Sequence, residues 1–140
     1  MKMLQKMIYQ AVLTSIGLSL LITNSYAEIA VVTHRSTSVS SVSTNDAKKI
    51  FLGKKRSFKP VDQKNGSAVH KEFYQKVVKK NPSQLKSYWS KMIFSGKGTP
   101  PKEMGNDAAV KQWISSNPGS IGYIHGTAVD QSVKVLLRVR

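Results

Sequence analysis

The chain has 140 residues, 22 lysines and arginines against seven acids, and no cysteine. Without cysteine it can form neither a disulfide framework nor a thiolate metal site, and it cannot be a lipoprotein. The formal net charge of +15 makes anionic partners the expected class. Nucleic acid is not expected, because the lysines are spread along the chain and accompany no helix-turn-helix or aromatic-interleaved pattern.

Residues 1–27 have the features of a secretory signal peptide. Two lysines precede an apolar stretch over residues 11–22, and Ser25 and Ala27 place small residues where signal peptidase requires them. An uncleaved anchor is the alternative, but the stretch is shorter than the roughly 20 residues that span a bilayer. We expect cleavage after Ala27 and a periplasmic or secreted domain over residues 28–140 that is not embedded in a membrane.

The first predicted elements follow the leader directly. The β-branched run over residues 29–33 predicts a strand. Residues 36–41 are small and rich in hydroxyl groups, so they predict a loop that either caps the next helix or meets a ligand. Ser43 followed by Asp46 is a variant of the capping box, and the apolar spacing after it predicts a short helix over residues 44–52.

A brief strand and a second helix come next. Residues 58–62 predict the strand. From Ser67 the pattern becomes helical, with Val69, Phe73 and Val77 at i, i+4 and i+8. One face of this helix is therefore expected in the core.

The third helix has the clearest start. Asn81 supplies an N-cap and Pro82 occupies the first helical position. We expect the apolar stripe that follows to pack in the core rather than to hold a cofactor. The stripe consists of Leu85, Trp89, Met92 and Ile93. Residues 95–101 predict an exposed loop because of their glycines and prolines, and they lack the second glycine and the preceding strand of a P-loop.

A fourth helix and two strands complete the chain. Asn106 caps a helix with an apolar face, which residues 117–119 end. Strands are expected over residues 121–124 and 133–139. Strands and helices thus alternate, which predicts an α/β fold in two or three layers rather than a helical bundle.

Two separated motifs resemble the second half of phosphate-type substrate-binding proteins, which feed ABC importers. They are IFLGK at residues 50–54 and NPGSIGY at residues 117–123, and they flank Gly66-Ser67. The resemblance covers residues 29–125. It implies an α/β fold, namely a single small lobe of a type 2 periplasmic binding protein-like fold, with a mixed sheet and about four helices. Because that family closes two lobes on its ligand, one lobe alone implies weak binding of phosphate.

The candidate ligand site lies where the second helix starts, at Gly66 and Ser67. The first backbone N–H groups of a helix lack helical partners and the helix dipole is positive there, so an oxyanion can be held. The alternative is that Ser67 only caps the helix. The resemblance implies phosphate binding by this loop, and it extends the candidate site to Gln63, Lys64, Asn65, Gly66, Ser67 and Ala68.

The loop departs from the family pattern. That pattern has arginine, three intervening residues and then Ser-Gly-Thr, whereas this chain has Gln63 followed by Ser67-Ala68-Val69. Serine is kept, but the bidentate charged contact of arginine is lost. Gln63 can donate without charge, and Lys64 can supply charge with looser geometry.

Catalysis, bound metals and cofactors are not expected. The three histidines, His34, His70 and His125, are too scattered for a zinc motif or a catalytic set. His70 is expected at the surface. No paired carboxylates and no nucleophile-elbow serine occur.

The expected function is therefore that of a periplasmic solute-binding-like protein. It would bind phosphate or a related oxyanion for an ABC import system, or descend from such a protein, with an ABC permease or an envelope protein as its partner. The alternative is an envelope interaction module outside transport, which uses the same lobe to dock a protein or an anionic polymer.

Overall fold

The computed structural model describes residues 28–140. The predicted signal peptide lies outside the described residues. In chain order the elements are β1 (Ile29–Thr33), α2 (Thr44–Phe51), β2 (Lys59–Gln63), α3 (Ala68–Phe73), the π-helical turn η1 (Tyr74–Val78), α4 (Pro82–Phe94), β3 (Lys102–Met104), α5 (Asp107–Ser116), β4 (Ser120–His125), the 3-10 turn η2 (Gly126–Ala128) and β5 (Lys134–Val139). Within the described part of the chain, no helix is long and apolar enough to cross a membrane.

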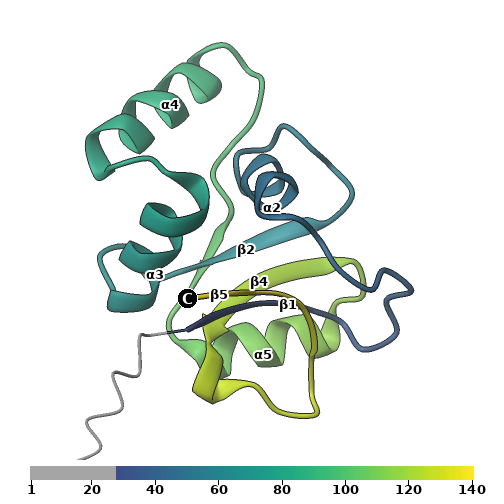
Figure 1. Ribbon diagram of the computed structural model, residues 1–140. Coiled ribbons are helices and arrows are strands. Elements are labelled where there is room, and N and C mark those ends of the chain that lie inside the picture. Colours follow the sequence, from purple (N-terminus) through teal and green to yellow (C-terminus); the bar gives the residue numbers. More distant parts are fainter. Residues whose placement is uncertain (1–27) are drawn as a thin grey trace, which may run out of the picture.

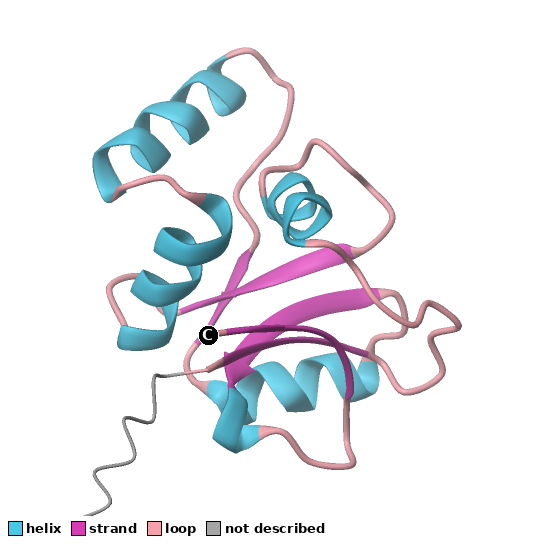
Figure 2. Ribbon diagram, viewed as in Figure 1, coloured by secondary structure: helices cyan, strands magenta, loops and turns pink. Residues whose placement is uncertain are grey.

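The five strands form one mixed sheet in the order β3-β2-β4-β1-β5. β2 pairs in parallel with β3 and β4, whereas β1 pairs antiparallel with β4 and β5. Helices α2 and α3 lie on one face and α5 lies on the other (Figures 1 and 2). The predicted α/β fold with a mixed sheet is confirmed, in its three-layer form.

The interior strand β1 packs against both helical layers. Its five residues are all buried. Successive side chains of a strand point to opposite faces. Ile29 and Val31 therefore pack under α2 and α3, while Ala30 and Val32 pack under α5. A continuous β-branched run is what a strand covered on both faces requires.

An aromatic cluster fills the core between the sheet and the α2–α3 layer. The ring of Phe73 stacks on that of Tyr123, with centroids 3.8 Å apart and an interplanar angle of 6°. Phe51 meets both rings edge-on, at 4.7 Å from Phe73 and 5.6 Å from Tyr123. This cluster fixes α3, and with it the loop that precedes α3, against β4.

The predicted helix starts are confirmed by their capping bonds. Ser43 Oγ accepts the backbone N–H of Asp46 at 3.0 Å at the start of α2. Asn81 and Gln84 form a reciprocal capping box at the start of α4, with bonds of 2.8 and 3.0 Å. Asn106 Oδ1 accepts the N–H of the third helical residue of α5 at 2.8 Å.

Helix α4 lies outside the sheet layers, and its packing face differs from the predicted stripe (Figure 1). The inward side chains recur at i, i+3, i+4 and i+7. They are Leu85, Tyr88, Trp89 and Met92. The prediction that Ile93 packs in the core is wrong, because at 3.6 residues per turn it lies about a quarter turn from the middle of this face, and its side chain is 55% exposed.

Candidate functional site

The predicted ligand-binding residues form one tight turn between β2 and α3. The turn is closed by a bond from the N–H of Ser67 to the carbonyl of Lys64 at 3.0 Å. Gly66 has φ +81°, a left-handed value that favours glycine. Lys64, Asn65, Gly66 and Ala68 are exposed and Ser67 is half-buried. The loop is therefore open to solvent.

Ser67 is the N-cap of α3. Its Oγ accepts the backbone N–H of His70 at 3.4 Å. A hydroxyl group can accept one hydrogen bond and donate another, so this cap leaves the O–H of Ser67 able to donate. The N–H groups of Ala68 and Val69 come before the first intrahelical bond and are the remaining donors of the turn.

Gln63 is turned into the fold. Its side-chain amide nitrogen donates to Asp107 Oδ1 at 2.7 Å and to the carbonyl of Tyr123 at 3.0 Å. Both N–H groups of this amide are thus used to tie β2 to β4 and α5. The residue is 2% exposed. Gln63 supports the turn from below and has no amide N–H group left for a ligand.

A carboxylate from the neighbouring strand occupies one donor of the loop. Glu103 Oε1 accepts the backbone N–H of Asn65 at 2.7 Å. Its negative charge opposes an anion in the turn. No local pattern predicts this contact, because β3 is a three-residue edge strand that follows a proline-rich loop.

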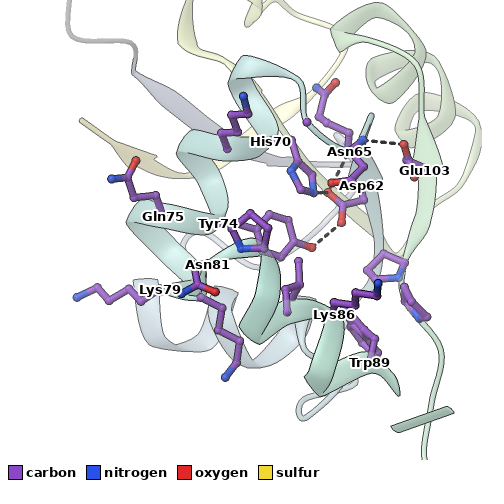
Figure 3. A pocket seen from close by; sticks show the side chains of 18 residues that line it. Asp62, Asn65, His70, Tyr74, Gln75, Lys79, Asn81, Lys86, Trp89 and Glu103 are labelled. Atoms are coloured by element: carbon purple, nitrogen blue, oxygen red, sulfur yellow. Dashed lines mark hydrogen bonds and ion pairs between the residues drawn. The ribbon is translucent and has the colours of Figure 1, made fainter. Parts of the chain in front are cut away.

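A cavity of about 1050 Å³ extends from this loop along α3 to α4. Figure 3 shows Asn65 and Glu103 at one end of the cavity and Lys86 and Trp89 at the other. Four lysines line it together with apolar side chains of α4 and the proline loop. The lysines are Lys71, Lys79, Lys80 and Lys86. The cavity is far larger than an inorganic oxyanion, so the loop occupies only one end of it.

A buried carboxylate lies on the cavity wall. Asp62 is 8% exposed. Its Oδ2 accepts the hydroxyl of Tyr74 at 2.5 Å, and its Oδ1 accepts both the hydroxyl of Tyr123 and the backbone N–H of Gln63. His70 Nε2 lies 3.9 Å from Oδ1 (Figure 3). Three elements, β2, β4 and the α3–η1 segment, therefore meet at this one side chain.

Burial dominates the acid–base properties of this cluster. Loss of solvent raises the pKa of the Asp62 carboxyl above its ordinary value, although the hydrogen bonds from Tyr123 and Tyr74 and the charge of His70 oppose the shift. Burial and the neighbouring carboxylate raise the pKa of both tyrosine hydroxyls far above the usual range. Both tyrosines are therefore protonated donors.

One histidine, His70, is not placed as expected. The prediction that His70 lies at the surface is wrong, since it is buried with its ring 4.5 Å from that of Tyr74. Its position one turn into α3 directs it toward Asp62. His125 is paired instead with Asp107, at 2.7 Å. Over residues 28–140, no group of three or more histidines and acids could hold a metal ion.

Comparison with known proteins supports the fold. No protein-family model and no curated protein matches the sequence. Among solved structures, a phosphate ABC transporter substrate-binding protein with bound phosphate from Clostridium perfringens is similar at a TM-score of 0.63 and 21% identity, over 79% of this chain and 45% of that one. An ABC-type phosphate transport receptor from Vibrio cholerae gives 0.63 and 15%, over 79% and 46%. PstS from Borrelia burgdorferi gives 0.58 and 13%, over 79% and 47%.

The chain thus spans less than half the length of each of these structures. It has the fold of a single lobe of a periplasmic binding protein-like structure, with a five-stranded mixed sheet and four α-helices among the described residues. The fold that the sequence resemblance implied is confirmed.

Proposed function

We propose that the protein is a solute-binding-like lobe that binds phosphate or a related oxyanion at the loop Lys64–Ala68. The observation that carries the proposal is the exposed turn at the start of α3, where the N–H groups of Ala68 and Val69 have no helical partner and the hydroxyl of Ser67 can still donate. The bound phosphate in the C. perfringens structure supports this class of ligand.

The charges around the loop predict weak binding. Lys64 and Lys71 supply positive charge with flexible geometry. Glu103 opposes it at the amide of Asn65, and the amide of Gln63 is occupied within the fold. The loop has no arginine for a bidentate contact and is open to solvent. We therefore expect a dissociation constant for phosphate of about 1 mM, equivalent to a binding free energy of about −4 kcal/mol.

Titration calorimetry of phosphate and sulfate into residues 28–140, which we call the mature protein, tests the site. We expect saturable heat with phosphate near millimolar concentration, and at least about tenfold weaker binding by Ser67→Ala, because one charge-assisted hydrogen bond contributes about 1.5–3 kcal/mol. Sulfate shows whether the site distinguishes the two anions.

The matched control for this titration is Ser43→Ala. It removes an equivalent helix cap from α2, at a similar cost of about 1 kcal/mol in stability, but it should leave phosphate binding unchanged. Phosphate heat that does not saturate, or that Ser67→Ala leaves intact, would contradict the proposal.

Export and transport belong to the same proposal. Residues 1–27 would direct the chain to the periplasm, and an ABC permease or an envelope protein would cover the open side of the loop. The likeness of the fold to proteins named as ABC-type receptors supports a link with import.

An envelope interaction module is the second candidate function. The observation that favours it is the outward face of α4, where Phe94 is 95% exposed beside several lysines. Phe94 adjoins Ile93, which is 55% exposed, and exposed apolar side chains that adjoin one another are typical of interaction sites.

A further inference from the structure

The C-terminal end of α4 exposes two large apolar side chains side by side. Phe94 is 95% exposed and Ile93 is 55% exposed, and they are the two most exposed large apolar side chains of the described residues. We name residues 91–97 the α4 tip. Figure 1 places this end of α4 at the outer edge of the molecule, on the side away from the sheet. A flat partner surface could therefore reach the tip without meeting another element.

The tip lies in a strongly cationic part of the chain. Residues 73–102 contain seven lysines and no acid. Lys91 and Lys97 flank the two apolar side chains, and neither takes part in an ion pair among the described residues. Uncompensated charge of one sign disfavours a second copy of this chain as the partner and favours an anionic surface.

The backbone N–H groups and the Ser95 hydroxyl of the tip already donate hydrogen bonds within the helix end. The N–H of Ser95 donates to Lys91 at 3.0 Å, that of Gly96 to Ile93 at 3.1 Å, and that of Lys97 to Met92 at 2.9 Å, in each case to the carbonyl oxygen. The hydroxyl of Ser95 also donates to the carbonyl of Lys91, at 2.8 Å.

Bonded donors favour lipid over protein as the partner. A backbone end with its donors satisfied can enter the headgroup region of a bilayer without leaving unpaired N–H groups. A protein partner would instead be recognised through about one hydrogen bond per 100–200 Å², and apart from the ammonium groups of Lys91 and Lys97 the donors of the tip are already bonded.

We propose that the α4 tip is a peripheral contact with a bilayer that carries anionic phospholipids. Phe94 and Ile93 enter between the headgroups, while Lys91 and Lys97 lie at the lipid phosphates. Apolar insertion combined with lysine attraction is the usual basis of interfacial binding. The oxyanion loop plays no part in this contact, so Ser67→Ala should bind vesicles as the unaltered protein does.

Cosedimentation with vesicles tests the proposal. The mature protein should bind vesicles of phosphatidylcholine with about 30% phosphatidylglycerol and bind pure phosphatidylcholine much less. The double variant Ile93→Ser/Phe94→Ser should bind the anionic vesicles at least about tenfold more weakly, because it loses the burial of two large apolar side chains.

Val39→Ser is the matched control, since Val39 is an exposed apolar residue, at 40%, on a different segment. It should leave vesicle binding unchanged. In Phe94→Trp, the fluorescence added by the new indole should shift to the blue on binding.

Two results would overturn the proposal. Equal binding by the double variant would mean that the net charge of the chain alone is responsible. Absence of binding to the anionic vesicles would also overturn it, and would leave an acidic protein as the partner class for the tip.

Discussion

Replacing Phe73 with alanine should lower the free energy of unfolding by about 3–5 kcal/mol. The side chain is fully buried, stacks on Tyr123 and meets Phe51 edge-on. Its removal leaves a cavity that the fixed rings around it cannot fill. A loss of this size is a large part of the 5–15 kcal/mol that typically stabilises a domain, and urea denaturation followed by circular dichroism measures it.

Phe94→Ala is the matched control for this prediction. It makes the same change at a side chain that is 95% exposed, so stability should change by no more than about 0.5 kcal/mol. Similar losses in the two variants would show that the aromatic cluster does not hold α3 against β4.

Asp62→Ala should also be strongly destabilising, by about 2–4 kcal/mol under acid conditions. It removes the acceptor of the Tyr74 and Tyr123 hydroxyls and of one backbone N–H group. Each buried donor left without a partner costs about 1–3 kcal/mol. Asp46→Ala, which removes a more exposed acid paired with Lys55, should cost about 1 kcal/mol or less.

The pH dependence of this loss has a definite sign. Burial raises the pKa of Asp62 in the folded protein above the ordinary value of 3.8, so the folded state favours the neutral acid. The contribution of Asp62 to stability is then fully present below pH 3.8 and is lost as the pH rises through the raised folded value. The difference in stability between the parent protein and Asp62→Ala should therefore shrink with rising pH.

Urea denaturation of both proteins at steps from about pH 3 to about pH 8 measures this difference in stability. The contributions of the other acids to the pH dependence cancel, because both proteins share those acids. A difference that grows with rising pH would mean that the ionised carboxylate is the stabilised form. The assignment of burial as the dominant cause would then be wrong.

Local patterns in the sequence were sufficient to predict the helices and most of the strands. Ser43, Asn81 and Asn106 each mark a helix start because their short polar side chains accept backbone N–H groups that have no other partner. The largely apolar run of β1, in which only Thr33 is polar, marks a strand buried on both faces. These features depend on near neighbours in the chain, and near neighbours are visible in the sequence.

Features that depend on distant parts of the chain were not predictable from the sequence. The strand β3 exists because β2 offers it an edge, and its three residues carry no pattern of their own. Ile93 was assigned to the core from its spacing, but the packing of α4 against distant residues leaves it 55% exposed.

The candidate site also combines local features, which the sequence predicts, with contacts between distant residues, which it does not. The sequence located the turn at Gly66-Ser67 and its helix start, which are local. It missed the bond from Asn65 to Glu103 and the internal bonds of Gln63, because those partners lie 38 to 60 residues away along the chain. The one signal for the buried cluster was a charged residue, Asp62, inside an otherwise buried strand end.

The most direct test of the oxyanion loop is the amide ¹⁵N–¹H spectrum of the mature protein during a phosphate titration. The N–H signals of Ala68 and Val69, and those of the adjoining residues 66–67, should move together and saturate with one dissociation constant, because the free N–H groups of Ala68 and Val69 would contact the anion. Shifts that are confined to the lysines of α4, or that rise without saturation along the whole basic surface, would contradict a site at the start of α3.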